Sequence, residues 1–454
     1  MKFSKLSVDK LIDSNGFECE CGKTHKAKGL SVIKIGQGVI NELPTILQSL
    51  KIVKPFIVTD INEYRAAGEK VETILRGANI QYGLHIIPSD ADKNIAPAEF
   101  ATGSIALNFD VTCDAILCVG SGVMNDLCKM ISNITGKPSV VVATAPSMDG
   151  YASDCAAMEV NNIKASLKTV IPVALICDID IMSQAPMRML HAGLGDMIGK
   201  YSALSEWKIA NMIVGDSYCS EIEALVRESL DKIVANATGV KNRDATATKN
   251  ITEGLILSGI AMAFAGNSRP ASGLEHYFSH GWEMMAIANG RECALHGLQV
   301  GVGTLFVLKI YEKLKEINPT MERAILAADK FDENEWEKVI RRVFIDTADD
   351  IIAIAKKTRK NAREDRLQRA QKIIDNWAKI VKIAEETPSF SEIESIMKSV
   401  GMPTTAEEIG IKKEDVINAF VCSRDIRDKY LLSSMLWDIG YLDEFAVWLE
   451  KTLS

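Results

Sequence analysis

Three histidines and one aspartate carry the strongest chemical signal in this sequence. The chain has only six histidines, and His276, His280 and His296 lie within 21 residues of one another. A helix would present His276 and His280 on one face, because they are four residues apart. Asp196 stands in the glycine-bounded segment GLGDMIGK, Gly193–Lys200. Imidazole and carboxylate groups suit Zn²⁺, Fe²⁺ or Ni²⁺, and three ligands leave a coordination position for a substrate oxygen. Each histidine taken alone has the alternative of an ordinary structural role.

A glycine-containing loop forms a second candidate site. It follows the apolar run Ala115–Val119 and opens a helical pattern. Its residues are Gly120, Ser121, Gly122, Val123, Met124, Asn125 and Asp126. Glycines let a backbone approach a pyrophosphate, and the free N–H groups at a helix start favour negative charge. Asn125 stands where a full dinucleotide motif has its third glycine, so a plain strand–helix turn is the alternative.

Polar side chains also follow two other predicted strands. Thr144, Ser147, Asp149 and Ser153 belong to one loop, and their hydroxyls and carboxylate suit a ribose, a phosphate or a substrate hydroxyl. The alternative for this loop is a helix cap followed by a turn. Asp60 ends the strand PFIVT. Its carboxylate can accept from a ribose 2′-hydroxyl, which would favour NAD over NADP, or it can cap the next helix.

Two further motifs have competing interpretations. The segment CECGKTH, with Cys19, Cys21 and His25, resembles half of a zinc knuckle. It has no fourth ligand nearby, so a β-turn or hairpin tip is favoured over a metal site. The run Lys356–Lys372 is basic, but it contains Glu364 and Asp365 and no aromatic residue. We therefore favour a solvated helix face over an anion-binding arm.

The elements that must position these residues change type along the chain. Up to residue 180, short apolar runs alternate with helical stretches such as Ile61–Gly77 and Asn125–Ile134, which is the βαβ pattern of a parallel sheet. The predicted strands are Leu30–Ile35, Pro55–Thr59, Gly83–Ile87, Ala115–Val119, Ser139–Ala143 and Val173–Asp178. Beyond this point the pattern is helical. We expect an α/β domain of Rossmann type over residues 1–180 and an all-α domain over 181–454.

Composition excludes several classes of protein. The 454 residues carry 52 basic and 60 acidic side chains, so the net charge is −8, which argues against a non-specific nucleic-acid or anionic-membrane binder. Hydrophobic residues make up 47% and charged residues 25%, as in ordinary globular proteins. The ten cysteines are spread along the chain without a disulfide pattern. With no apolar signal segment and no apolar run long enough to span a membrane, we expect a cytoplasmic protein.

Several of these motifs together resemble one enzyme family. GSGVMND, ATAPSMDGYAS, GLGDMIGK, NSRPASGLEHYFSH and HGLQVGVG are similar to motifs of the sn-glycerol-1-phosphate dehydrogenases, with the bacterial branch the most similar. That family belongs to the superfamily of iron-containing alcohol dehydrogenases and dehydroquinate synthase-like proteins. The resemblance implies a Rossmann-like α/β domain followed by an all-helical domain.

The resemblance also implies roles for particular residues. Cofactor contacts would come from Gly120, Gly122, Val123, Met124, Asn125, Asp126, Thr144, Ser147 and Ser153. Metal ligands would be Asp196, His276 and His296, and substrate contacts would be Asp149, Asp196 and His280. Asp196 and His280 would be the catalytic residues.

The implied reaction is the reduction of dihydroxyacetone phosphate by NADH or NADPH, with a divalent Zn, Ni or Fe ion as Lewis acid. His280 would supply or relay the proton. Lys200 and Arg269 are candidates for the substrate phosphate, and an ordinary ion pair is their alternative. A glycerol-type polyol dehydrogenase, a dehydroquinate synthase-like lyase and a non-enzymatic binding protein are the rival functions. We expect a homodimer.

Overall fold

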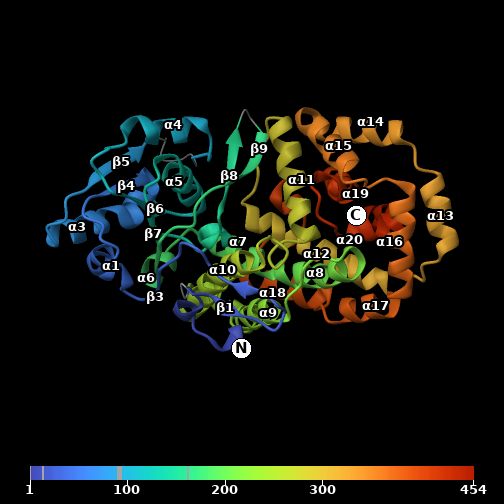
Figure 1. Cartoon of the computed structure of the whole chain (residues 1–454), viewed down its shortest axis with the longest axis horizontal. Helices are drawn as coiled ribbons and strands as arrows, with labels where there is room; N and C mark the ends of the chain where they lie inside the picture. The colour runs from blue at the N-terminus through green and yellow to red at the C-terminus, as the bar shows by residue number, and fades with distance from the viewer. Residues whose placement is uncertain (1, 13–14, 89–94, 161–162, 454) are drawn as a thin grey trace. The chain divides into compact units, whose positions relative to one another are not determined.

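The computed structural model describes residues 2–12, 15–88, 95–160 and 163–453, which form two compact units (Figure 1). Unit 1 comprises residues 1–197 and 220–267, and unit 2 comprises residues 198–219 and 268–454. The predicted domain boundary at residue 180 marks the change from a strand pattern to a helix pattern, and it stays a prediction. The compact units have other bounds than the predicted domains, because three long helices that follow residue 180 belong to unit 1.

A six-stranded parallel sheet forms the centre of unit 1 (Figure 1). Its strand order is β3 (Val32–Gly36), β10 (Ala174–Asp178), β7 (Ser139–Ala143), β6 (Ala115–Gly120), β4 (Pro55–Asp60) and β5 (Gly83–Ile87). All residues of β6, β7 and β10 are buried, because elements cover both faces of the sheet. All six predicted strands are confirmed, with ends shifted by one or two residues at most.

Four helices connect these strands: α1 (Leu43–Ser49), α3 (Glu69–Gly77), α4 (Glu99–Asn108) and α5 (Gly122–Thr135). The predicted helix Ile61–Gly77 is interrupted, since α2 (Ile61–Glu63) is followed by a π-helical turn, Tyr64–Gly68, before α3 begins. A Cβ atom on Gly68 would lie only 2.5 Å from Cδ2 of the Tyr64 ring, so the ring packs directly on the backbone of Gly68. Leu47, Val71 and Leu75 pack with Leu117 and Val142 of the sheet in one apolar cluster.

Two antiparallel hairpins lie outside the main sheet. The hairpin of β1 (Phe17–Glu18) and β2 (Thr24–His25) confirms the hairpin tip predicted for the CECGKTH segment. The hairpin of β8 (Cys155–Val160) and β9 (Ile163–Lys168) is not among the predicted strands. Its first strand, CAAMEV, contains alanines that indicate no strand, although Ala156 and Met158 alternate in burial with their neighbours.

The remaining helices of unit 1 are α6 (Ile179–Met182), α7 (Met187–Ile198), α9 (Ser220–Ala235) and α10 (Ala245–Ala265). Glycines let two of them approach the loop that follows β7. A Cβ atom on Gly193 of α7 would lie 1.9 Å from the carbonyl oxygen of Pro146. One on Gly259 of α10 would lie 2.9 Å from Cβ of Ala152. The backbone of the loop therefore packs directly on the backbone of both helices.

Unit 2 is helical, as predicted for the second half of the chain. Its helices are α8 (Lys200–Val214), α11 (Leu274–Ala288), α12 (His296–Leu314), α13 (Met321–Asp329), α14 (Glu333–Phe344), α15 (Ala348–Lys357), α16 (Arg363–Asp375), α17 (Trp377–Glu385), α18 (Phe390–Val400), α19 (Lys413–Ile426), α20 (Leu432–Asp438) and α21 (Leu442–Thr452). One apolar core includes side chains from all of these helices except α18, and in it the ring of Phe278 of α11 lies 5.6 Å from that of Phe306 of α12 and 6.1 Å from that of Phe420 of α19, between ring centres.

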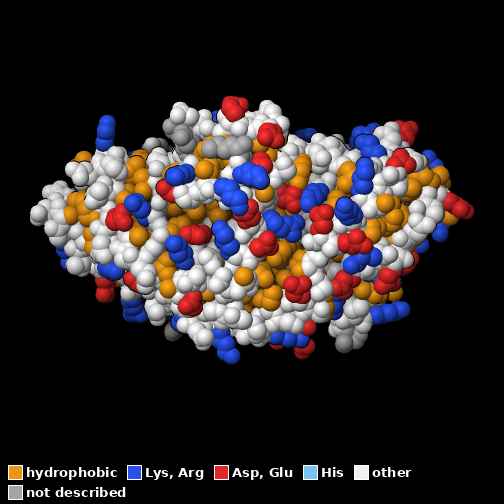
Figure 2. All heavy atoms as spheres, turned by 90° about the horizontal axis from the view of Figure 1, so that it is seen from below, with side chains coloured by type: hydrophobic (Ala, Val, Ile, Leu, Met, Phe, Trp, Pro, Cys, Tyr) orange, Lys and Arg blue, Asp and Glu red, His pale blue; other side chains and the backbone are white. Residues whose placement is uncertain are grey.

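The basic run Lys356–Lys372 lies at α15 and α16, and most of it forms the predicted solvated face. Arg359 pairs with Asp365 at 2.9 Å, one of the acidic partners expected from the sequence. Arg366 differs from the prediction, because it is fully buried with its guanidinium 3.9 Å from the centre of the Trp437 ring. On the side of the molecule that Figure 2 shows, basic and acidic side chains are interspersed. None of the helices within the described residues is long and apolar enough to cross a membrane.

The close approach at Gly193 generates a stability prediction. Gly193→Ala would place a methyl group against the Pro146 carbonyl, so we expect a loss of about 1–3 kcal/mol and a lower thermal midpoint. Gly103→Ala in α4 is the matched control, since a Cβ there has nothing within 4 Å, and it should stabilise by about 0.5–1 kcal/mol. Thermal unfolding of both variants checks this. Equal midpoints for the two would contradict the packing described.

Candidate active site

The predicted glycine loop is a tight turn between β6 and α5. Gly120 ends the strand, and a Cβ atom on it would lie 2.4 Å from Cβ of Met124. Gly122 begins the helix, and a Cβ atom there would lie 2.9 Å from Cγ of Met148. The turn lies at the carboxyl end of a central parallel strand, where folds of this kind bind their ligands. A side chain at either position would therefore displace a methionine side chain, and Val123 follows the two glycines in the first turn of α5.

The side chains of Asn125 and Asp126 in α5 bind other segments of unit 1. Asn125 is fully buried, and its Nδ2 lies 3.4 Å from the carbonyl oxygen of Gly150. Asp126 accepts from the backbone N–H of Ala157 at 3.0 Å, which ties α5 to β8. A role of these two side chains at a cofactor stays a prediction.

Lys129, one turn further along α5, is a buried cation that sequence reasoning missed. Its ammonium group donates to the carbonyl oxygens of Gly150 and Cys155 and to Oγ of Ser153, the last two at 3.0 and 3.1 Å. Burial lowers its pKa, and the nearby charge of Asp126 acts in the opposite direction. This cation therefore holds the loop that follows β7 against α5. No spacing pattern signals it, because its partners are mostly backbone atoms.

Asp60 takes the capping role that was one of its two predicted alternatives. Its carboxylate accepts from the backbone N–H of Glu63 at 2.7 Å, at the start of α2. Glu63 in turn accepts from the backbone N–H of Ser121 in the glycine turn at 3.2 Å. Burial raises the pKa of Glu63, against the hydrogen bonds from Thr144 and Ser121. Glu63 was also missed, although an Asp followed three residues later by a Glu is a recognisable helix-start signal.

The hydroxyl residues predicted as cofactor contacts all belong to the loop after β7. Thr144 is buried, and its backbone N–H donates to the carbonyl oxygen of Gly120 at 3.3 Å. Ser147 is nearly buried, and Ser153 donates to the carbonyl oxygen of Gly150 at 2.9 Å. The loop is held from within by Tyr151, whose hydroxyl donates to the carbonyl oxygen of Ala145 at 2.7 Å.

Two predicted site residues of unit 1, Asp149 and Asp196, are hydrogen-bonded to each other. The backbone N–H of Asp149 donates to the carboxylate of Asp196 at 3.0 Å. The Asp149 carboxylate accepts from the Ser258 hydroxyl of α10 at 2.8 Å. Asp196, on α7, is fully buried. The backbone approach at Gly193 therefore brings a predicted metal ligand and a predicted substrate contact together.

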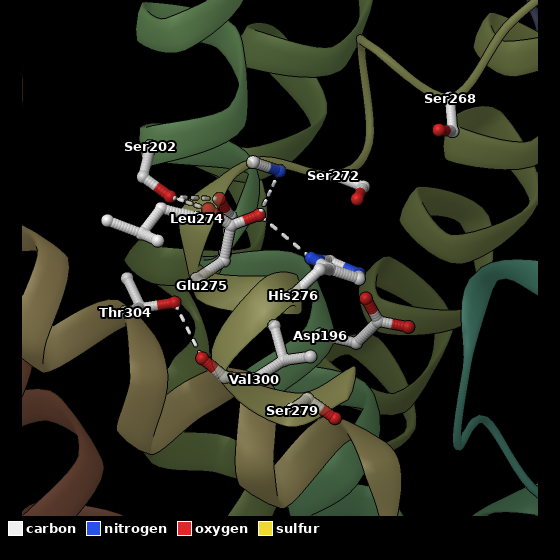
Figure 3. A network of polar contacts seen from close by, with 12 residues as sticks. Asp196, Ser202, Ser268, Ser272, Leu274, Glu275, His276, Ser279, Val300 and Thr304 are labelled. Carbon is white, nitrogen blue, oxygen red and sulfur yellow. Dashed lines mark hydrogen bonds and ion pairs between the residues drawn. The ribbon is translucent and has the colours of Figure 1, made fainter. Parts of the chain in front are cut away.

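His276 of unit 2 is held by a buried carboxylate (Figure 3). Its Nδ1 atom lies 2.8 Å from Oε1 of Glu275, and that carboxylate also accepts from the N–H of Gly273 at 2.6 Å and from the Ser202 hydroxyl. Burial alone would raise the pKa of Glu275, but the hydrogen bond and charge of His276, with those two donors, hold it below its usual value. An ionised Glu275 makes Nδ1 of His276 the protonated nitrogen, which leaves Nε2 with a lone pair.

His280 and His296 lie close to His276, as the sequence predicts. Their ring centres are 6.4 and 5.3 Å from that of His276 and 5.8 Å from each other. His296 begins α12, and its Nδ1 lies 2.9 Å from the Ser279 hydroxyl. Burial lowers the pKa of His280 to about 3, so this ring is neutral near pH 7. A neutral imidazole can pass a proton from one nitrogen to the other, so His280 is suited to a proton relay.

The two candidates for a phosphate contact both belong to unit 2. Lys200 begins α8 and is fully buried. Arg269 is nearly buried, forms an ion pair with Asp216 and donates to the carbonyl oxygen of Tyr430 at 2.6 Å. Arg269 thus makes the ion pair that was its predicted alternative role.

The contacts of Lys129 generate a prediction for unit 1. Lys129→Met would remove the buried ammonium group that donates to the carbonyl oxygens of Gly150 and Cys155, and would leave them only neutral donors such as the Ser153 hydroxyl. We expect a loss of about 1–3 kcal/mol and faster proteolytic cleavage between residues 149 and 155. The exposed Lys70 of α3 offers the control Lys70→Met, which should change neither. Thermal unfolding with limited proteolysis checks this, and identical behaviour of both variants would contradict it.

Comparison with known proteins agrees with the resemblance read from the motifs. The family model of the iron-containing alcohol dehydrogenases matches residues 34–186. A glycerol-1-phosphate dehydrogenase (NAD(P)+) of Halalkalibacterium halodurans is 33% identical over 295 residues, which cover 65% of this chain and 74% of that protein. The protein of the same description from Bacillus licheniformis is 27% identical over 425 residues, 93% of each chain.

Solved structures with low sequence identity support the fold alone. A glycerol dehydrogenase of Schizosaccharomyces pombe gives a TM-score of 0.59 at 15% identity, covering 93% of this chain and 91% of that one. A 1,3-propanediol oxidoreductase gives 0.61 at 15% identity, covering 95% and 100%. With the match at 33% identity over most of a relative's length, the chain belongs to the glycerol-1-phosphate dehydrogenase family of the iron-containing alcohol dehydrogenases.

Proposed function

We propose that this chain is a metal-dependent oxidoreductase that reduces dihydroxyacetone phosphate to sn-glycerol 1-phosphate with NADH or NADPH. Family membership supports the reaction class. The observation that carries the proposal is the hydrogen bonding of the ring nitrogens of two histidines in unit 2. Nδ1 of His276 is held by the Glu275 carboxylate, which leaves its Nε2 for a metal, and the ring of His296, whose Nδ1 is within hydrogen-bond distance of Ser279, lies 5.3 Å from that of His276 between ring centres.

We assign the metal ligands to Asp196, His276 and His296. The donor set fits a divalent ion such as zinc, nickel or iron, since a ligating histidine ordinarily donates its other ring N–H to a carboxylate, carbonyl or similar acceptor. Glu275 supplies that acceptor for His276. When bound, the ion would act as a Lewis acid towards the substrate carbonyl.

The cofactor belongs, in this proposal, to the turn Gly120–Asp126 and to the loop after β7. Gly120 and Gly122 support it, because glycines at the start of a helix let a pyrophosphate approach the backbone N–H groups there. Thr144, Ser147 and Ser153 are the hydroxyls of that loop. Asp60 already caps α2, so a choice between NAD and NADP does not follow from it.

The proton and the substrate hydroxyls are assigned to three side chains. His280, neutral near pH 7, relays the proton that the new hydroxyl requires. Asp149, whose carboxylate is oriented by the Ser258 hydroxyl, accepts from a substrate hydroxyl, and Asp196 also contacts the substrate. Lys200 and Arg269 are the candidates for the phosphate contact, and the guanidinium of Arg269 also contacts Asp216 and the carbonyl oxygen of Tyr430.

The contacts of Arg269 with Asp216 and Tyr430 also favour a second candidate, a dehydrogenase of unphosphorylated polyols.

The test is NADH and NADPH oxidation with dihydroxyacetone phosphate and with dihydroxyacetone, each with Zn²⁺, Ni²⁺, Fe²⁺ or Mg²⁺, and chiral analysis of the product. We expect a metal-dependent rate with the phosphate and sn-glycerol 1-phosphate as product. Turnover of dihydroxyacetone alone would select the second candidate, and turnover of neither would reject both. The predictions of a homodimer and of a cytoplasmic location remain part of the proposal.

The hydrogen bond from Glu275 generates a prediction about metal affinity. Glu275→Gln removes the charge that orients and polarises His276, so metal binding should weaken by about 10–100-fold. Competition with a chelator measures this affinity, and the thermal midpoint of the metal-free variant shows whether the fold is kept. Glu292→Gln, at an exposed position after α11, is the control. Unchanged affinity in Glu275→Gln would contradict the assigned orientation of His276.

A further inference from the structure

The β1–β2 hairpin carries donor groups that the proposed reaction does not use. Cys19, Cys21, His25 and Cys219 each offer one ligand atom, and these four atoms lie within 4.8 Å of one another. We infer that these four residues bind a structural zinc ion. Three sulfurs and one imidazole nitrogen are a common donor set of closed, four-coordinate structural zinc sites.

The hairpin turn brings the first three donors together. The N–H of Gly22 donates to the carbonyl oxygen of Cys19 at 2.9 Å, and the N–H of Cys19 donates to the carbonyl oxygen of Lys23 at 3.1 Å. Gly22 has a φ of +81°, a left-handed conformation that favours glycine. The chain therefore reverses directly after Cys21, and Sγ of Cys21 lies 3.2 Å from Nε2 of His25.

His25 is oriented as a ligand by its other nitrogen. Its Nδ1 lies 2.8 Å from the carbonyl oxygen of Phe264, and a carbonyl can only accept, so Nδ1 carries the proton. Nε2 therefore presents its lone pair towards the cysteines, as in many zinc sites. The ring is buried and packs against Phe3 and Phe264, with ring centres 5.5 and 5.8 Å away. This packing holds the ring in that orientation.

Cys219 supplies the fourth ligand that the local sequence lacks. It is joined by its peptide bond to Ser220, the first residue of α9, and its side chain is buried. The helix α9 packs in unit 1 against the 3₁₀ turn Phe3–Lys5, and Lys5 pairs with Glu228 at 3.3 Å. A zinc ion would therefore clamp the hairpin to the start of α9.

The same residues form no disulfide in the structure. Three cysteines that converge with a histidine leave one sulfur over in any disulfide arrangement, whereas zinc uses all four donors. Serine substitution of one cysteine then removes a ligand at almost unchanged volume.

The experiment is metal analysis of the whole chain, by zinc content and by the spectrum after cobalt substitution. Thiolate-to-cobalt charge-transfer bands report only the cysteine site, because Asp196, His276 and His296 have no sulfur. We expect Cys21→Ser and Cys219→Ser each to lose one zinc per chain together with these bands. His25→Cys should keep the zinc and strengthen the bands. Cys155→Ser and Cys293→Ser, at exposed cysteines, are the matched controls and should change neither.

The outcomes separate this site from the proposed catalytic metal. His296→Ala should lower activity and total metal while the thiolate bands persist. If Cys21→Ser fails to fold, the unsubstituted chain still decides, since absence of thiolate bands after cobalt loading would overturn the inference. Unchanged zinc content in a folded Cys21→Ser variant would overturn it equally.

Discussion

Two buried carboxylates at the start of α11 constrain much of unit 2. A buried carboxyl group needs hydrogen-bond partners, and Glu206 of α8 accepts from the N–H groups of Leu274 and Leu432 at 2.8 and 3.0 Å. Burial raises the pKa of Glu206, and the charge of Glu275 raises it further. These hydrogen bonds join α8, α11 and α20. Gly273 lies between the carboxylates, since a Cβ atom there would be 2.8 and 3.0 Å from their oxygens. The orientation of His276 depends on this arrangement.

In unit 1 the main constraint is the close packing of α7 and α10 on the loop after β7. Gly193 and Gly259 remove the side chains that would keep α7 and α10 away from the loop after β7. The Asp149 N–H then reaches Asp196, and the Asp149 carboxylate reaches Ser258. Lys129 holds the other side of the same loop. The proposed function thus draws on a loop whose backbone is fixed from several sides.

The sequence predicted the elements that depend on local pattern and missed those that depend on distant partners. The six strands are continuous apolar runs because both faces of the sheet are buried, so each was found. The β8–β9 hairpin was missed because alanines give no strand signal. Lys129 was missed because its partners are mainly backbone atoms of other segments, and Glu63 because Ser121 and Thr144 lie far from it in the chain. Cys219 lies too far from Cys19 in the chain for any spacing rule to connect them.

The proposed function requires that Asp196, His276 and His296 hold one metal ion. X-ray diffraction from crystals of the zinc-loaded chain, recorded above and below the zinc absorption edge, tests this most directly. We expect an anomalous peak bonded to Asp196 and to Nε2 of both His276 and His296. A fully zinc-loaded crystal without a peak at these atoms would contradict it.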